Sequence, residues 1–254
     1  MDLAQVTSGF AVGTIVGITG VGGGALMTPL LLLVFGIAPA TAVGTDLLFA
    51  AITKSGGTLV HARQRTIDWR VVRLLATGSL PAAAATLLIV HDAFPGGLGG
   101  ARQLIGATLG VALLLTAAAL IYRRRLLALR ERLMVGEHAW ATVATGALLG
   151  VLVSISSVGA GALGVTVLLF LHPKLATPRI VGTDIAHAVP LALVAGLGHW
   201  WLGSIDWTLL GTLLAGSLPG IWLGSRLAPR IPEHFLRAGL AGMLILIGGK
   251  LIAA

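Results

Sequence analysis

Long apolar stretches separated by short polar connections dominate this chain. A helix needs ~20 apolar residues to cross ~30 Å of hydrocarbon. Four stretches have about that length, at residues 70–91, 101–122, 207–228 and 235–253. They are continuous, whereas the strands of a membrane barrel would alternate apolar and polar residues in shorter segments. The pattern therefore predicts an all-α polytopic membrane protein.

Three further apolar stretches are interrupted by unusual residues. The stretch at about 40–61 contains Asp46 and Lys54, whereas glycines break those at 7–35 and 139–171 near their middles. Ionisable side chains inside a membrane segment are costly, so they indicate where function resides. Glycine permits positive φ and close backbone approach, which a helix break buried in protein requires.

Composition supports a membrane protein and excludes several kinds of site. Of all residues, 56% are hydrophobic and 10% are charged, and the mean hydropathy is +0.98, beyond what a soluble domain of this size shows. The chain has no cysteine, which excludes disulfides and thiolate metal sites. It also lacks a nucleotide loop, a zinc-binding pattern and a hydrolase signature. We therefore expect no cofactor, no metal and no enzymatic activity.

The second half of the chain repeats the first. Val-Gly-Thr-Asp occurs at 43–46 and again at 181–184. The same offset superposes two other blocks, Ile-Asp-Trp at 67–69 on 205–207 and Gly-Ser-Leu-Pro at 78–81 on 216–219, and an offset smaller by one superposes the glycine-rich residues 21–26 on 158–163. Four matched blocks in one order indicate internal duplication. We divide the chain into a first repeat half (1–122), a basic cytoplasmic linker (123–138) and a second repeat half (139–254).

The basic residues discriminate between two membrane topologies. The net charge is +8, and nine of the seventeen Lys and Arg lie in or directly beside two loops. This clustering is more simply explained by a cytoplasmic membrane face than by a nucleic-acid-binding surface. If the two glycine-broken stretches each cross the membrane once, there are eight spans with parallel halves. Ten Lys and Arg then lie on the cytoplasmic side and six on the outer side, with Lys54 left out of the count. If each stretch turns back at its glycines, the halves are inverted and the count becomes fourteen against two, Arg102 and Lys250.

We favour the second topology, in which each half is a Gly-broken re-entrant helical hairpin plus three transmembrane helices. In the alternative, eight spans with parallel halves, the glycines would serve only to pack helices closely.

The two breaks suggest where an anion would bind. The N-terminal end of a returning half-helix presents unpaired N–H groups with a partial positive charge, and two such ends near the midplane would hold a small oxyanion. Thr28 and Ser154 offer further hydroxyls, although any of these hydroxyls could instead bond its own helix backbone. The candidate substrate-binding residues of the breaks are Thr19, Gly22, Gly23, Gly24, Ser156, Ser157, Gly159 and Gly161.

Four ionisable residues complete the candidate site. Lys54 would bind the substrate or a counter-ion, with Asp184 of the other half as a candidate partner; alternatively it extends to the cytoplasmic surface. Asp46, Asp184 and His187 are candidates for proton or ion coupling. The aspartates could instead cap their helices, and a structural hydrogen bond would also explain His187.

Two matched histidines lie at the ends of equivalent segments. His61 superposes on His199 at the offset that aligns the two Val-Gly-Thr-Asp blocks. Both are expected to anchor the protein at the membrane interface.

These segments resemble the sulfite exporter TauE/SafE family, also called the 4-toluene sulfonate uptake permease family. The resemblance is carried in the first half by GITGVGGGALMTPLLLLVFGIAPATAVGTDLLFAAITKSGGTLVH (17–61), TIDWRVV and GSLP, and in the second half by SVGAGALGV, IVGTDIAHAVPLALVAGLGHW and GSLPGIWLGSRL. It covers essentially the whole chain, weakly only in the central basic loop. Lys54 has no counterpart in the second half, where Ala192 stands, so the halves need not contribute equally to binding.

The resemblance implies secondary transport of small sulfur-containing anions, such as sulfite, sulfonates or sulfoacetate, across the bacterial cytoplasmic (inner) membrane. We expect alternating access at a midplane site between the halves, with protons as a candidate coupling ion. An anion channel on the same scaffold and, more remotely, a membrane-embedded enzyme are the alternatives. The expected partners are a small anionic substrate and the lipid bilayer, without nucleic acid. The sequence leaves the oligomeric state open, with a monomer and a homodimer as the alternatives.

Overall fold

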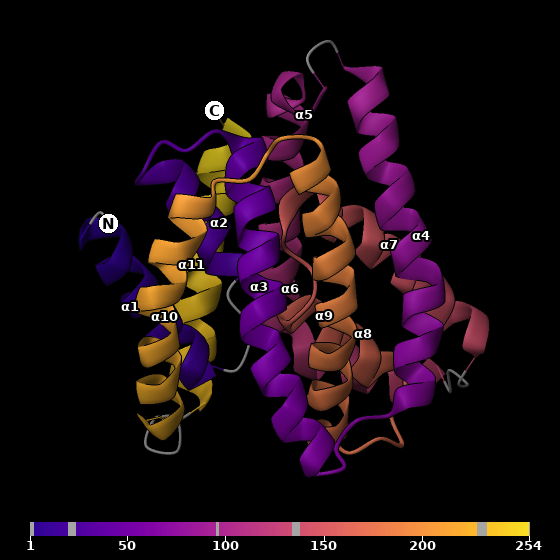
Figure 1. Ribbon diagram of the computed structural model, residues 1–254. Coiled ribbons are helices and arrows are strands. Elements are labelled where there is room, and N and C mark those ends of the chain that lie inside the picture. Colours follow the sequence, from indigo (N-terminus) through magenta and orange to yellow (C-terminus); the bar gives the residue numbers. More distant parts are fainter. Residues whose placement is uncertain (1–2, 20–23, 95–96, 134–137, 228–232, 254) are drawn as a thin grey trace.

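The computed structural model describes residues 3–19, 24–94, 97–133, 138–227 and 233–253, and Figure 1 shows their arrangement. No strand occurs among these described residues, which confirms the all-α prediction. The helices are α1 (Leu3–Thr19), α2 (Gly24–Leu33), α3 (Pro39–Arg63), α4 (Trp69–Ala93), α5 (Gly97–Gly100), α6 (Arg102–Leu133), α7 (Ala139–Ser156), α8 (Ala162–Leu171), α9 (Thr177–Trp201), α10 (Trp207–Leu227) and α11 (Glu233–Ala253).

Several of these helices have the length and composition of membrane spans. Within the described residues, five qualify: α4, the Arg102–Arg123 part of α6, α7, α9 and α10. Shorter apolar helices cover Leu3–Ile18, Ala162–Leu171 and Ala238–Ile252. Helix α3 is as long as α9 but is not among the five, because Asp46, Lys54 and Arg63 reduce its hydropathy. This is a multi-pass membrane protein.

The repeated Ile-Asp-Trp block begins a helix in each half. The Asp68 carboxylate accepts hydrogen bonds from the N–H groups of Arg70 and Val71 at the start of α4. Asp206 accepts one from Leu209 in the same way at the start of α10. Such side chains satisfy N–H groups that have no partner within the helix. The two halves therefore share this hydrogen-bonded helix start as well as the sequence block, since the same residues begin equivalent helices.

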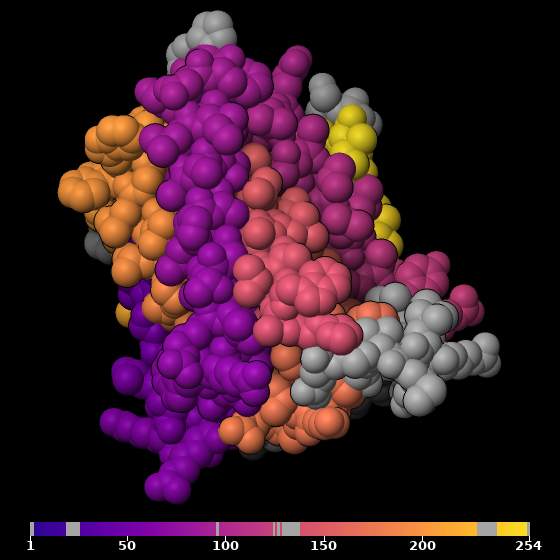
Figure 2. All heavy atoms as spheres, turned by 90° about the vertical axis from the view of Figure 1, so that its right-hand side faces the viewer, coloured from indigo at the N-terminus to yellow at the C-terminus, as the bar shows by residue number. Residues whose placement is uncertain are grey.

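The long helices pack in pairs across the two halves: α1 along α10, α4 along α7, α3 along α9, and α6 along α11. Helices α1 and α10 run parallel, because Gly9 faces Leu213 and Gly13 faces Ser217. Helices α4 and α7 are parallel by the same criterion, and Figure 2 shows them side by side on one outer face. The first arm of each hairpin thus packs against a helix of the other half.

The two central helices, α3 and α9, run antiparallel (Figure 1). The N–H of Asp68, just after α3 ends, donates to Thr183 near the start of α9 at 2.9 Å. Reciprocally, the N–H of Asp206, just after α9 ends, donates to Thr45 near the start of α3 at 3.2 Å. Opposite helix directions are what inverted halves require. The orientation of the halves in a bilayer stays a prediction.

Helices α7 and α8 form a hairpin that starts and finishes at one end of the molecule. Thr142, in the first turn of α7, hydrogen-bonds through Oγ1 to Nε2 of His172, just after α8, at 2.9 Å. The turn between the arms, residues 157–161, contains three residues with positive φ: Ser157 (59°), Gly159 (139°) and Gly161 (132°). Glycine adopts these conformations readily. The predicted break of the second half is thus confirmed.

The α1–α2 hairpin starts and finishes at the opposite end. Its first helix begins beside the start of α10, where the Thr212 hydroxyl donates to Gln5. Its second helix leads through residues 34–38 into the start of α3, which also lies beside the start of α10. The break itself, at 20–23, lies outside the described residues.

Side chains typical of membrane interfaces gather at both ends of the bundle. Exposed Trp69 and Trp140 lie at the starts of α4 and α7, and exposed Trp200, Trp201 and Trp207 lie at the opposite end. Tryptophan is enriched at both membrane surfaces. The end that carries the start of α4 is called the basic end here, because it also carries Arg63, Arg65, Arg70, Arg73, Lys174, Arg179 and Arg226.

The basic end is expected to face the cytoplasm. Because the chain has no cysteine, single cysteines in place of exposed Lys174 at the basic end and exposed Gly99 at the opposite end report on one site each. A membrane-impermeant maleimide added to intact cells should label Gly99→Cys and leave Lys174→Cys unmodified until the membrane is opened. Labelling of Lys174→Cys from outside would contradict the orientation.

Candidate functional site

The break between α7 and α8 contacts both central helices. The Lys54 ammonium of α3 donates a hydrogen bond to the carbonyl of Ala160, with Nζ 3.1 Å from the oxygen. The Asp184 carboxylate of α9 accepts a hydrogen bond from the N–H of Gly161. Gly164 makes room for this carboxylate, since a Cβ there would collide with Asp184 Oδ1. The break therefore brings together a cation from the first half and an anion from the second.

The other repeated aspartate has an equivalent position in its own half. Asp46 is fully buried and accepts hydrogen bonds from both the hydroxyl and the backbone N–H of Thr28 on α2. The hydroxyl–carboxylate distance, from Oγ1 to Oδ2, is 2.5 Å. The Ser157 hydroxyl of the other hairpin also lies close to Asp46. Asp46 and Asp184 thus face the second arms of the two hairpins.

Neither repeated aspartate caps its own helix. No acidic residue occurs in the first turn of α3 or of α9. Both carboxylates instead bind groups of a neighbouring helix or break. The helix-capping interpretation is therefore wrong.

Lys54 links the two carboxylates electrostatically. Its ammonium interacts with Asp184 and, more weakly, with Asp46. Because it points to the break at Ala160, the alternative in which Lys54 extends to the cytoplasmic surface is wrong. No ion pair between Lys54 and Asp184 occurs among the described residues, so their pairing stays a prediction.

His187 faces the same region from α9. Its Nε2 lies 2.8 Å from the Ser79 hydroxyl of α4, so a structural hydrogen bond is present. Its Nδ1 is buried without a partner among the described residues, and the ring lies within electrostatic range of Lys54. Ser79 was not predicted as a site residue, although its place in the repeated Gly-Ser-Leu-Pro block was a signal.

The region around His187 is asymmetric. When the two halves are aligned on their Val-Gly-Thr-Asp blocks, His187 corresponds to Phe49 and Ser79 to Ser217. Phe49 is 1% exposed and belongs to the apolar core, and the Ser217 hydroxyl is buried without a partner in the described part of the chain. Of these two equivalent positions, only the one in the second half therefore carries a titratable side chain, that of His187.

The remaining predicted residues differ in their positions: some bond their own helix, some form the turn of a break, and some lie at helix ends. The Ser156 hydroxyl donates to the carbonyl of Leu152, and that of Ser154 to Val151, so both bond their own helix backbone. Ser157, Gly159 and Gly161 form the turn of the break. In the first hairpin, Thr19 is the last residue of α1 and Gly24 the first of α2. Gly22, Gly23 and the side chain of Thr19 lie outside the described residues.

The matched histidines hold the halves together. His199 is fully buried, with Nε2 2.9 Å from the carbonyl oxygen of Ser154, so its predicted role as an interfacial anchor is wrong. Gly44 lies against His199, and Gly182 lies reciprocally against His61, and a Cβ on either glycine would collide with the histidine. The glycine of each Val-Gly-Thr-Asp block thus makes room for a histidine of the other half.

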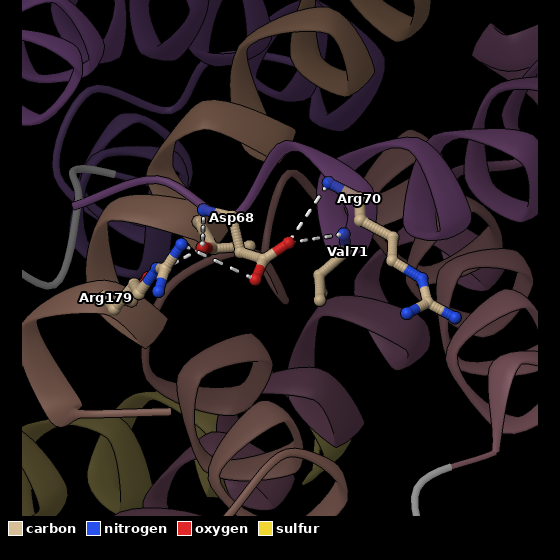
Figure 3. A network of polar contacts seen from close by, with 5 residues as sticks. Asp68, Arg70, Val71 and Arg179 are labelled. Carbon is tan, nitrogen blue, oxygen red and sulfur yellow. Dashed lines mark hydrogen bonds and ion pairs between the residues drawn. The ribbon is translucent and has the colours of Figure 1, made fainter. Parts of the chain in front are cut away.

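A separate pocket of ≈ 170 Å³ opens at the basic end, between α4, α7 and the end of α8. Asp68 forms one wall, and its carboxylate binds two backbone N–H groups and lies 4.0 Å from the Arg179 guanidinium (Figure 3). Arg70, His172 and Lys174 also line it, and none of the predicted site residues that the structure describes is among its lining residues. No group of three or more His, Asp or Glu able to hold a metal ion occurs in the described residues.

Comparison with known proteins gives consistent matches along the chain. Residues 6–251 match the family described as "Sulfite exporter TauE/SafE". "Probable membrane transporter protein YjnA" of Bacillus subtilis is 41% identical over 99% of this chain and 100% of its own length. "Probable membrane transporter protein YdhB" of the same organism is 29% identical over 93% of this chain and 97% of its own. A "Probable membrane transporter protein" of Xylella fastidiosa is 28% identical over 92% of this chain and 88% of its own.

No solved structure matches this chain. The family match nevertheless covers both hairpins, both central helices and the residues between them. The chain therefore belongs to the sulfite exporter TauE/SafE family of membrane transporters.

Proposed function

We propose that this protein is a secondary transporter that carries small anions, of the sulfur oxyanion class, across the bacterial cytoplasmic membrane. The observation that carries the proposal is the meeting of Lys54 from one half with the broken backbone of the other half at Ala160. A half-buried ammonium beside the N-terminal end of a half-helix suits an oxyanion, because both provide hydrogen-bond donors and positive charge. The family name supports the sulfur chemistry of the substrate.

The charges of the site favour coupling to protons. Lys54 lies near two carboxyl groups, Asp46 and Asp184, so the site carries one more negative than positive charge when all three are ionised. A second uncompensated negative charge would be costly in such a buried place. Uptake of a proton by Asp46, Asp184 or His187 would compensate the charge of the incoming anion.

The way the halves are joined supports alternating access as the proposed transport mechanism. In inverted repeats, the two halves exchange conformations, which opens a site at their interface first to one side and then to the other. The first arms α1 and α7 each pack on a helix of the opposite half. Movement of one half would therefore carry the other half's hairpin arm with it.

Flux measurements in liposomes test transport against a channel. Purified protein should take up sulfite or a sulfonate with saturable kinetics, and an imposed proton gradient should change the initial rate severalfold. Protein-free liposomes and liposomes with denatured protein are the controls. Flux that rises linearly with anion concentration and does not depend on the proton gradient would contradict a coupled transporter and favour a channel.

A further inference from the structure

The Asp184 carboxylate occupies the place where an external anion would bind to α8. It comes from a different helix, α9, and accepts a hydrogen bond from the N–H of Gly161, the residue just before α8 begins. Its Oδ1 lies over Gly164, in the first turn of α8, where only the absence of a Cβ leaves space. The N-terminal end of a helix attracts an anion through its N–H groups and its dipole. Here the protein supplies that anion itself.

This carboxylate is held by few donors. Asp184 is 1% exposed, yet its Oδ1 has no hydrogen-bond partner among the described residues. A buried acceptor without a partner is unfavourable. The Oδ1 of Asp46, at the equivalent place in the other half, also lacks a partner in the described part of the chain, but the Asp46 carboxylate accepts two bonds from Thr28, whereas that of Asp184 accepts one, from Gly161. Of the two carboxylates, Asp184 is therefore the easier one to displace.

The charged and titratable groups around Asp184 come from two helices. Lys54 and, beyond it, Asp46 face the site from α3, and His187 belongs to α9 itself. The break contributes the N–H of Gly161, and the Ser79 hydroxyl of α4 bonds His187. Lys54 interacts more strongly with Asp184 than with Asp46. An anion that replaced the Asp184 carboxylate would therefore gain both the α8 end and this ammonium.

We propose that the Asp184 carboxylate is an internal anion that competes with the transported oxyanion for the N-terminal end of α8 and for Lys54. Protonation of Asp184 converts the carboxylate to a neutral carboxylic acid, which frees the α8 end and removes the negative charge near Lys54. A monovalent oxyanion then takes the same place, and the total charge of the site is unchanged. One proton is thus bound for each monovalent anion. This inference rests on the proposed anion transport and assigns its coupling to one residue.

Binding to the purified, detergent-solubilised protein tests the competition. Methanesulfonate is a suitable probe, because it stays a monoanion over the range in which carboxyl groups and histidines titrate. Calorimetry in two buffers of different ionisation enthalpy gives both the Kd and the number of protons taken up. We expect the wild type to take up about one proton per anion and to bind about tenfold more weakly per pH unit above the ionisation of Asp184.

Asp184→Asn should bind methanesulfonate with little dependence on pH, without proton uptake, and more tightly than the wild type at high pH. Asp46→Asn is the matched control and should keep the pH dependence. Asp184→Ala provides a second test, because it removes the competing group without adding an amide. Thermal unfolding curves establish that each variant is folded.

Three results would overturn the inference. If Asp184→Asn keeps the wild-type pH dependence, another group takes up the proton. If both folded Asp184 variants fail to bind while the wild type binds, the carboxylate is needed for binding and is no competitor. If the wild type binds independently of pH, the competition is absent although anion transport stands. Failure of every protein, the wild type included, to bind methanesulfonate and sulfate would instead contradict the proposed substrate class.

Discussion

Replacement of Lys54 by alanine is expected to weaken anion binding at least tenfold and to reduce flux in liposomes accordingly. The Lys54 ammonium lies at the break of the second half, 3.1 Å from the Ala160 carbonyl oxygen. A hydrogen bond to a charged group contributes about 1.5–3 kcal/mol, and ~1.4 kcal/mol corresponds to ~tenfold in Kd. The loss should be large because no second cation at the equivalent position, Ala192, can replace it.

Lys174→Ala is the matched control for Lys54→Ala. Lys174 is an exposed lysine at the basic end, and it lines the separate pocket rather than the site between the halves. Its removal should leave affinity unchanged while lowering the net charge by the same amount. Calorimetric titration with methanesulfonate measures both variants, and thermal unfolding shows whether they are folded. Equal affinity in Lys54→Ala and wild type would eliminate Lys54 from the site.

The glycine-broken hairpin of the second half could be predicted from the sequence because its signals are local. Glycine at 159 and 161 is compatible with positive φ, and the break is found at 157–161. The extent of α6 could not be predicted, because nothing local ends this helix. Helix α6 continues to Leu133, through residues assigned to a linker, because leucine and arginine favour helix and neither glycine nor proline interrupts them.

Contacts across the halves could not be predicted from the duplication alone. Aligning the two halves shows which residues are equivalent, but in the fold many of them bind the other half. The Thr45 hydroxyl accepts a hydrogen bond from the Asp206 N–H, and the Thr183 hydroxyl accepts one from the Asp68 N–H. The repeated Thr of each block thus binds the backbone of the other half. The acceptor of Lys54 is a carbonyl of the broken backbone, which arises only when the hairpin turns. The Ser79–His187 bond likewise depends on how α4 packs on α9.

The α1–α10 contact explains a further set of residues, the glycines spaced four apart on both helices. Gly9, Gly13 and Gly17 face the backbone of α10, and Gly216, Gly220 and Gly224 face the backbone of α1. Small residues at such spacing let two helices approach closely, and packing is the main force between helices in lipid. This interface joins a hairpin arm of the first half to a helix of the second. Close packing of α1 on α10 is therefore expected to contribute to both the stability of the protein and its transport activity.

Gly220→Ala is expected to destabilise the protein strongly, whereas Gly211→Ala on the same helix should not. A Cβ at Gly220 would collide with the backbone of Phe10 and Thr14, but one at Gly211 meets nothing within 4 Å. Overpacking of this kind typically costs about 1–3 kcal/mol, and backbone atoms cannot move aside as a flexible side chain can. Alanine at Gly211 should be neutral or slightly stabilising, since alanine favours helix over glycine by up to ~1 kcal/mol.

Thermal unfolding in detergent and flux in liposomes, measured on both glycine variants, separate two roles of the α1–α10 interface. If α1 moves as one body with α10, Gly220→Ala should lower the flux per folded molecule as well as the unfolding temperature, because a wider separation misplaces the first hairpin, including Thr28, relative to Asp46 of α3. If the interface only holds the bundle together, the unfolding temperature alone should fall. Equal stability of Gly220→Ala and Gly211→Ala would contradict the close packing itself.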